Sequence, residues 1–268
     1  MIKPIAPSPA VCALFADWPE TCIWSCLQGV MGRLYADSFQ NPSWAAARLG
    51  DFCFLAGAPS REAALIPVRE QGRGAEYVIM VPQNAGWAAV IESVYETRAA
   101  AITRYATKKD SRGFDRKRLA QMAGDVPGGY EIRPIGRELF ERLKNLPWGW
   151  DLVRQYPDFG QFSRLGLGFA ALSQADGEPA AGASSYSSYL GGVEIEIDTR
   201  PEHRRKGLAR ACGARLILSC LEKGLYPSWD AHSPISLNLA LSLGYELDYA
   251  YPAYEVFPQG AGGPSPVL

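Results

Sequence analysis

The segment from Arg204 to Ala209 places three basic residues beside a glycine, between two stretches of opposite periodicity. Before it, Val193–Ile197 alternates apolar and acidic residues, which is typical of a half-buried strand. After it, apolar residues recur at helical spacing. Gly207 has no Cβ to obstruct a ligand, and the first N–H groups of a helix attract anions. The sequence therefore predicts a strand, a basic loop and a helix that together bind a pyrophosphate, with basic side chains assisting: Arg204, Arg205 and Lys206.

A second strand and a second helix follow this loop. Gly224 stands where the first helix is expected to stop, and Tyr226–Ala231 reads as a short strand. Ser233 followed by Pro234 is a strong helix start, because serine caps the free N–H groups and proline suits the first helical position. That helix is expected to end at Leu243–Tyr245.

The spacing Arg204-x-x-Gly207-x-Ala209 resembles the coenzyme A motif of the GNAT (GCN5-related) N-acyltransferases. The runs Trp229-Asp230-Ala231 and Leu243-Gly244-Tyr245 are similar to a two-part bacterial subgroup, the one that includes the zwittermicin A resistance acetyltransferase. The resemblance covers roughly the last half of the chain. The first half matches the subgroup only loosely, through 26–29 and 50–52.

The resemblance implies an α/β (α+β) protein in two parts. A C-terminal GNAT domain, with a mixed and mostly antiparallel sheet flanked by helices, is expected over residues 126–258. An N-terminal α/β accessory domain is expected over 1–125, and a disordered tail over 259–268. The turn-forming cluster at 125–129 sets the boundary. No internal repeat is visible, although two-part members of the family can hide a degenerate duplicate, and the first domain is a candidate for one.

The resemblance also implies that acetyl-CoA is the co-substrate. Its pyrophosphate would bind the N–H groups of the loop and helix start, and a main-chain N–H of the motif strand would stabilise the tetrahedral oxyanion. The second helix would add contacts at its first turn. The residues expected to contact the coenzyme are Ile197, Asp198, Thr199, Arg204, Arg205, Lys206, Gly207, Leu208, Ala209, Ser233 and Ser236.

Acyl transfer to an amine with a pKa near about 10.4 needs a base that removes a proton. Glu194, Glu196 and Asp198 alternate along the motif strand, so they share one face. The resemblance implies that an acid on this strand acts as the base, with Glu196 the first candidate and Glu194 the second. Three neighbouring acids are expected to raise one another's pKa. The alternative is an exposed face of solvated carboxylates.

One position departs from the family pattern. Many members have a tyrosine that protonates the leaving thiolate, and that position is Ala240 here. Tyr245, Tyr251 and Tyr254 are weak substitutes. The departure favours an alternative function, a catalytically silent acyl-CoA-binding sensor or interaction module.

Other side chains are candidates with a structural alternative. His232 is a third catalytic candidate, although a lone histidine is more often structural or solvated, and His203 is expected at the surface. Trp148, Trp150 and Tyr156 precede the core strands and are candidates for the acceptor pocket, although aromatics more often pack.

Composition argues against several other functions. The formal net charge is -1 and 47% of residues are hydrophobic, so neither nucleic acid nor membrane is expected as a partner. The spacing of the cysteines and histidines fits no metal site, and reduced thiols fit a cytoplasmic protein. The expected acceptor is the primary amine of a small molecule, with an antibiotic suggested only by the subgroup, and the expected state a monomer or homodimer. The basic residues of 98–118 read as a solvated loop and helix rather than an RNA site: Arg98, Arg104, Lys108, Lys109, Arg112, Arg116, Lys117 and Arg118.

Local patterns predict several further elements. Thr21–Leu27 reads as a strand, and Gly50-Asp51 as the turn of a hairpin. Asn84 is expected to cap a helix over 85–95, and two helices are expected over 137–146 and 150–156.

Overall fold

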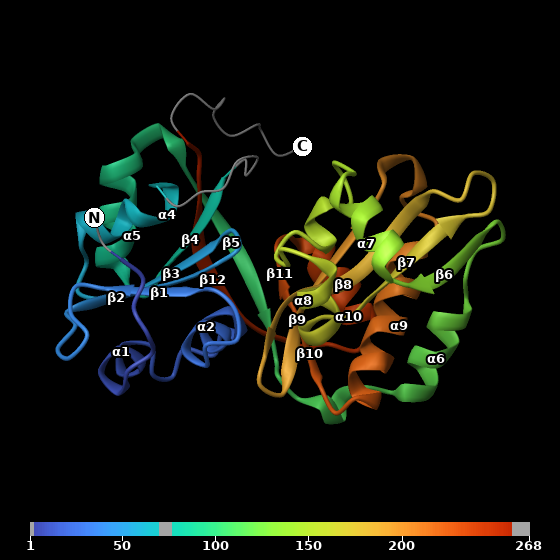
Figure 1. Cartoon of the computed structure of the whole chain (residues 1–268), viewed down its shortest axis with the longest axis horizontal. Coiled ribbons are helices and arrows are strands. Elements are labelled where there is room, and N and C mark those ends of the chain that lie inside the picture. Colours follow the sequence, from blue (N-terminus) through green and yellow to red (C-terminus); the bar gives the residue numbers. More distant parts are fainter. Residues whose placement is uncertain (1–2, 70–76, 259–268) are drawn as a thin grey trace. The chain divides into compact units, whose positions relative to one another are not determined.

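The computed structural model describes residues 3–69 and 77–258, and the chain divides into two compact units (Figure 1). Unit 1 comprises Met1–Arg104 with Ala250–Leu268, and unit 2 comprises Tyr105–Tyr249. These limits differ from the boundary expected after residue 125. Residues 105–125 group with unit 2, where α6 (Arg116–Gly124) packs along α9 (Leu208–Glu222). The expected tail at 259–268 lies outside the described residues.

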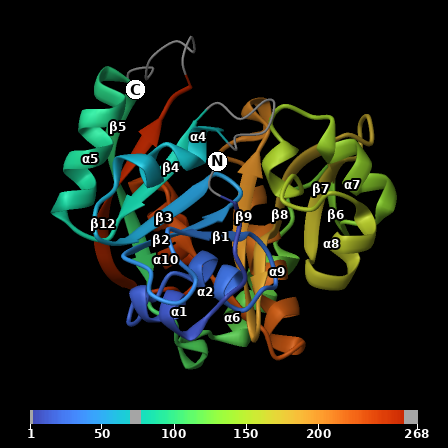
Figure 2. The same cartoon turned by 60° about the vertical axis from the view of Figure 1, so that its left-hand side comes forward.

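Unit 1 is a mixed sheet with helices. Its strands run in the order β1-β2-β3-β4-β12-β5, with β3 parallel to β4 and the pairs β1–β2, β2–β3 and β4–β12 antiparallel; β1 to β4 lie side by side in Figure 2. The C-terminal strand of the chain therefore completes the sheet of the N-terminal unit. The elements up to the boundary are α1 (Pro9–Leu14), α2 (Thr21–Leu27), β1 (Arg33–Ala36), β2 (Trp44–Leu49), β3 (Phe52–Gly57), α3 (Arg61–Ala64), α4 (Ile66–Arg69), β4 (Val78–Pro82), α5 (Ala85–Tyr95), η1 (Glu96–Arg98) and β5 (Ala99–Thr107), and the sheet also includes β12 (Leu247–Val256).

Two local predictions in unit 1 are confirmed and one is wrong. The hairpin turns at Gly50, with a φ of 57°, and the side chain of Asn84 caps α5 by accepting from Trp87 N at 3.2 Å. Thr21–Leu27 is the helix α2 and not a strand. In so short a run, apolar residues fit one face of a helix as well as one face of a strand, and α2 packs against β2.

Unit 2 is a five-stranded sheet in the order β10-β9-β8-β7-β6, in which β10 is parallel to β9 and the other pairs are antiparallel. The expected helix over 150–156 is only the short 3-10 turn η3, and the next helix starts later, where Asp158 caps it by accepting from Gln161 N at 2.8 Å. The remaining elements are β6 (Tyr130–Pro134), α7 (Arg137–Lys144), η3 (Trp150–Leu152), α8 (Phe159–Leu165), β7 (Gly168–Ser173), β8 (Pro179–Tyr189), β9 (Gly192–Thr199), η4 (Pro201–His203), β10 (Tyr226–Ser228), β11 (Asp230–Ala231), α10 (Pro234–Ser242) and β12 (Leu247–Val256).

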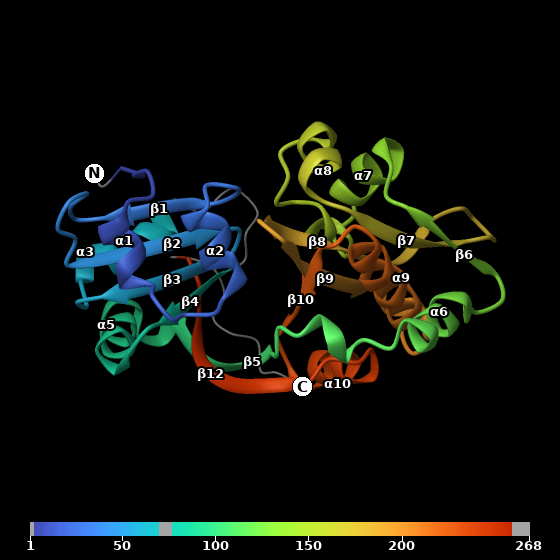
Figure 3. The same ribbon diagram turned by 90° about the horizontal axis from the view of Figure 1, so that it is seen from below.

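Helices cover both faces of the unit 2 sheet. A Cβ at Gly213 of α9 would meet Ile197 at 2.9 Å, and a Cβ at Gly182 would meet Leu152 of η3 at 2.5 Å. Gly182 pairs with Asp198, and Asp198 points to the opposite face from Ile197. The acidic face of β9 therefore lies on the η3 side, and α9 covers the other face, as Figure 3 shows with α7 and α8 opposite α9.

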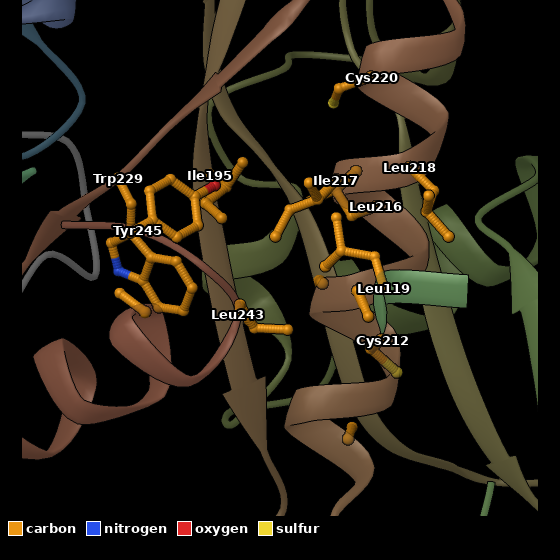
Figure 4. Packing of buried hydrophobic residues seen from close by; sticks show 14 of the residues in the cluster. Leu119, Ile195, Cys212, Leu216, Ile217, Leu218, Cys220, Trp229, Leu243 and Tyr245 are labelled. Carbon is orange, nitrogen blue, oxygen red and sulfur yellow. The ribbon is translucent and has the colours of Figure 1, made fainter. Parts of the chain in front are cut away.

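The core of unit 2 forms around α9 and the centre of β9. Ile195 is buried, with Leu216 and Ile217 of α9 on one side and the rings of Trp229 and Tyr245 on the other (Figure 4). The two rings meet edge to face, with centroids 5.5 Å apart. This packing fixes the helix that follows the basic loop against the strand that precedes it.

The two units share an order of elements that the sequence does not reveal. Unit 1 has the meander β1-β2-β3, a helical crossover to β4 parallel to β3, and then α5. Unit 2 has the meander β7-β8-β9, the α9 crossover to β10 parallel to β9, and then α10. No repeat is visible in the sequence, yet the topology is repeated.

The basic segment at 98–118 has structural partners. The guanidinium of Arg116 donates to Leu221 O near the end of α9, and that of Arg118 donates to Ser242 O at the end of α10, where cations suit the helix dipole. Exposed ion pairs join Lys108 with Glu246 and Arg112 with Asp110. The expectation of a solvated loop and helix is wrong for the first part of the segment, because Ala99–Thr107 is the strand β5 and Arg104 is 5% exposed, with its guanidinium over the Phe52 ring.

Two features are absent from residues 3–69 and 77–258. No helix in that part of the chain is long and apolar enough to cross a membrane. The same residues include no group of three or more His, Cys, Asp and Glu side chains that could hold a metal ion. All six cysteines lie in the described ranges as free thiols.

Candidate functional site

The loop between η4 and α9 has the backbone of an anion-binding cradle. Arg205 and Gly207 have positive φ, 59° and 86°, whereas the residue before each does not. Tight turns that contain residues of positive φ can point successive N–H groups toward one concavity, an arrangement that binds anions. Arg204 itself is extended, with φ -64° and ψ 159°. Gly207 is also the N-cap of α9, so the cradle continues into the first turn of a helix of 15 residues.

The N–H groups of this cradle are available. Ala211 N donates to Gly207 O at 3.1 Å, which is the first bond of the helix. Considering only described residues as acceptors, the N–H groups from Arg205 to Arg210 have no partner, and Gly207 has no side chain to cap them. A Cβ built at Gly207 would meet nothing within 4 Å. The predicted anion site is thus open, at the place that the sequence indicates.

Contacts from neighbouring elements hold the loop in shape. Arg204 Nε donates to Thr199 O at 3.2 Å, which ties the loop back to the end of β9. Tyr130 in β6 lies 2.7 Å from His203 Nδ1 and accepts from Lys206 Nζ at 3.0 Å through its hydroxyl. The expectation for His203 is corrected, because its ring is half-buried and anchored. No sequence signal identifies Tyr130, since it lies 73 residues from His203.

The two parallel strands beside the loop separate. β10 pairs with β9 from Gly192 as far as Glu194, which lies opposite Ser228. After one intervening residue, Trp229, the chain enters β11, which pairs with the end of β5 instead. β9 continues from Ile195 to Thr199 with no parallel partner among the described strands. This branch leaves the backbone groups on one edge of β9 without a strand partner among the described residues.

The ladder with β8 decides which N–H groups reach that edge. Arg200 N donates to Ala180 O, so by antiparallel alternation the N–H groups of Ile197 and Thr199 point away from β8. Asp198 Oδ1 accepts from Thr199 N at 2.6 Å. Of the three expected oxyanion donors, Ile197 is therefore the one whose N–H both faces the branch and has no competing acceptor within the described chain.

The acids of β9 do not form an exposed face. Glu194 is 8% exposed, whereas Glu196 and Asp198 are half-buried. Burial raises the pKa of Asp198, and the Thr199 N–H and the Arg204 charge oppose that shift. The physical cause is desolvation rather than the mutual repulsion expected from the sequence.

Glu196 shares its face with a cation that the sequence does not single out. Burial lowers the pKa of Arg154, while nearby Tyr186 and Glu196 act in the opposite direction. Tyr186 lies where the β8–β9 register shifts, between Ser185 and Ser187. A bulge of this kind re-aims a side chain and is frequent beside active sites.

Two of the tyrosines suggested as the acid that protonates the leaving thiolate donate their hydroxyl hydrogens to other groups of the protein. Tyr245 is fully buried, its hydroxyl donates to Pro227 O at 2.7 Å, and burial raises its pKa well above the usual value. Tyr254 donates to Glu92 Oε1 at 2.6 Å in unit 1, and its pKa is raised to about 12 by burial and by that carboxylate. Ala240 is buried in the core of unit 2.

The start of α10 uses both serines expected there. Ser233 caps the helix by accepting from Ser236 N at 3.2 Å, and Ser236 Oγ accepts from the indole N–H of Trp229 at 3.2 Å. His232 is exposed and directly follows β11. The structure therefore brings the α10 start next to the strand branch.

The three aromatic candidates for the acceptor pocket differ in exposure. Tyr156 is fully buried, and its hydroxyl donates to Ser185 Oγ at 2.8 Å. Trp148 is half-buried and Trp150 is 36% exposed. Packing thus accounts for Tyr156, and Trp150 is the most accessible of the three.

In unit 1, the place that corresponds to the strand branch of unit 2 is filled by continued strand pairing and by the side chain of Gln83. β3 stays paired with β4 as far as Leu55, and Gln83 N then donates to Leu55 O. The side chain of Gln83 accepts from Gly57 N at 2.8 Å and donates to Leu14 O at 2.7 Å. The indole N–H of Trp87 donates to Gly57 O at 3.0 Å. At that point the described part of unit 1 therefore has neither the strand branch nor the free backbone groups of unit 2.

Comparisons with known proteins show the family of the chain. A model of the family described as GNAT acetyltransferase matches residues 12–254, so the match includes unit 1 as well as unit 2. The chain is 25% identical over 244 residues to an uncharacterized N-acetyltransferase YdfB of Bacillus subtilis (strain 168), covering 87% of this chain and 89% of that protein.

Solved structures give the same result. A GCN5-related N-acetyltransferase-like protein from Streptococcus suis 89/1591 is 48% identical with a TM-score of 0.85, covering 92% of this chain and 96% of the other. A tandem GNAT protein from the clavulanic acid biosynthesis pathway covers 99% of both chains with a TM-score of 0.58. At 13% identity this second likeness concerns the fold alone.

Proposed function

Because the chain belongs to the GNAT acetyltransferase family, we propose that it transfers an acetyl group from acetyl-CoA to the primary amine of a small molecule, by direct attack in a ternary complex. The observation that carries the proposal is the open cradle of N–H groups from Arg205 to Arg210, beside a strand whose edge is freed by the branch. A βα turn without a ligand needs neither feature.

In this proposal the cradle binds the pyrophosphate of the coenzyme. Hydrogen bonds from N–H groups to a charged partner contribute about 1.5–3 kcal/mol each, and the helix dipole adds to them. Arg205 is exposed at the cradle and supplies charge. Arg204 and Lys206 act mainly on the shape of the loop, through Thr199 and Tyr130.

The thioester would lie along the freed edge of β9. The N–H of Ile197 is the donor proposed to polarise the carbonyl and to stabilise the oxyanion, a contribution of about 3 kcal/mol for a preorganised donor. Glu196 is the proposed base that takes the amine proton as the C–N bond forms and the C–S bond breaks. A cytoplasmic location, which suits six free thiols, is part of the same proposal.

The first experiment is calorimetric titration of the protein with acetyl-CoA, on the wild type, Gly207→Glu and Gly224→Glu. Both glycines have positive φ, 86° and 69°, and neither has an atom within 4 Å of its Cβ position. Both have a left-handed backbone, and they stand at opposite ends of α9. The helix dipole favours a carboxylate at Gly207 and disfavours one at Gly224, so a loss of binding confined to Gly207→Glu does not come from weakening of the helix. Binding lost in Gly207→Glu and kept in Gly224→Glu is the expected result.

Absence of binding to the wild type, or equal loss in both variants, would refute the coenzyme site. A thiol-release assay over a panel of amines then tests the transfer, and the resemblance to the antibiotic-resistance subgroup is a reason to include antibiotic amines. Glu196→Gln should lower kcat by about 100-fold or more with acetyl-CoA affinity unchanged. Unchanged turnover in that variant would remove Glu196 from the mechanism.

A further inference from the structure

Glu194 connects the two strands at the point where they separate. It lies opposite Ser228, at the end of the β9–β10 pairing, and it is 8% exposed. Its Oε1 accepts from the backbone N–H of Asp230 at 2.7 Å. Asp230 is the first residue of β11, so the carboxylate of one strand holds the chain that has just left it.

Other bonds hold the same short connection. Thr107 Oγ1 donates to Trp229 O at 2.7 Å, and the indole N–H of Trp229 donates to Ser236 Oγ at 3.2 Å. Tyr245 donates to Pro227 O at 2.7 Å. Thr107 belongs to β5, Ser236 to α10, and Tyr245 follows α10. Tyr189 of β8 also bonds to Ser228 Oγ at 2.7 Å, and Glu194 holds the connection from β9.

We infer that Glu194 is a positioning residue that fixes the strand branch for the thioester, and not the base. A carboxylate that accepts a backbone N–H at 2.7 Å has a structural task that an amide oxygen can also perform. A general base accepts a proton during the reaction, which a neutral amide cannot do. The inference rests on the proposed function, since it assigns a role in the acetyl-CoA site.

The test compares Glu194→Gln, Glu194→Ala and Thr107→Val. Glutamine keeps an acceptor for Asp230 N, whereas alanine removes it, and valine removes the Thr107 bond to Trp229 O without touching any acid. The measurements are kcat, the Kd of acetyl-CoA by calorimetry, and Tm.

The expected pattern is rescue by the conservative variant. Glu194→Ala should weaken acetyl-CoA binding by about tenfold or more, which corresponds to the loss of one hydrogen bond to a charged group. Thr107→Val should weaken it in the same direction, by about threefold or more. Glu194→Gln should keep acetyl-CoA affinity and kcat within about threefold of the wild type.

Two results would overturn the inference, and a third would overturn the proposed function on which it rests. A loss of about 100-fold or more in kcat for Glu194→Gln, with Kd and Tm unchanged, would make Glu194 the base. Unaltered acetyl-CoA affinity in both Glu194→Ala and Thr107→Val would also refute the positioning role. If Glu194→Ala does not fold, the kcat of Glu194→Gln and the acetyl-CoA affinity of Thr107→Val still test the positioning role. Wild-type protein that fails to bind acetyl-CoA would instead refute the proposed function.

Discussion

Replacing Tyr156 by phenylalanine separates packing from acceptor binding. The Tyr156 hydroxyl donates to Ser185 Oγ at 2.8 Å and lies 3.2 Å from Ser188 Oγ. Both serines keep another partner, because Leu167 N donates to Ser185 and Ser188 donates to Leu165 O. Phenylalanine therefore removes one neutral hydrogen bond and leaves no buried charge.

The free energy of unfolding should fall by about 0.5–1.5 kcal/mol, the net value of one such bond. For a domain of this size that corresponds to a decrease in Tm of about 1–6 °C. The KM for the amine acceptor should stay unchanged, because the ring is fully buried and packs against Phe162 with centroids 5.1 Å apart.

Urea unfolding and acceptor kinetics on the same protein give both quantities. Tyr95→Phe is the control, since that buried tyrosine donates to Ala64 O at 2.6 Å in unit 1 and should lose a similar amount of stability. A severalfold rise in acceptor KM for Tyr156→Phe, with unfolding unaltered, would show that this hydroxyl contacts the acceptor and that the packing argument is wrong.

Three further predictions concern charge and stoichiometry. Burial raises the pKa of Asp198. The favourable contribution of this group to the free energy of unfolding is therefore present at low pH and is lost as pH rises through the folded pKa. Asp198→Asn should raise Tm near neutral pH. In thermal melts at lower pH the difference in Tm from the wild type should become smaller toward about pH 4, and a difference that does not change with pH would contradict this. Arg118→Gln removes the contact with Ser242 O and should cost about 0.3–1 kcal/mol in urea unfolding, with acetyl-CoA affinity intact. Calorimetry should give one acetyl-CoA per chain, because Gln83 closes the equivalent place in unit 1, and a stoichiometry near two would refute that.

The cradle is predictable from sequence because its determinants are local. Gly207 and the three basic residues before it are neighbours in sequence, and the positive φ at Gly207 is the conformation that glycine favours. The helix starts at Asn84 and Ser233 are predictable for the same reason, since a cap depends on residues within one turn.

The contacts that shape the site could not be predicted, because they join distant parts of the chain. Thr107 and Trp229 are 122 residues apart, and Tyr130 and His203 are 73 apart. A single hydroxyl residue such as Thr107 carries no pattern. The shared topology of the units is hidden in the same way, since an order of elements can persist without any matching run of residues.

The two units differ chiefly in the path of the chain beyond their second parallel strand. In unit 1, the backbone N–H of Gln83 continues the pairing with β3. Its side chain accepts a hydrogen bond from Gly57 N and donates one to Leu14 O. In unit 2, Thr107 and Glu194 hold the chain after β10 on a separate path, and beyond Glu194 that edge of β9 has no partner among the described strands. In the proposed function the glycine loop binds the pyrophosphate, and the thioester needs the edge of β9 as well. A chain that kept Gly207 and lost these two bonds would therefore retain the motif and lose affinity for the coenzyme, which is the outcome expected for Thr107→Val and Glu194→Ala.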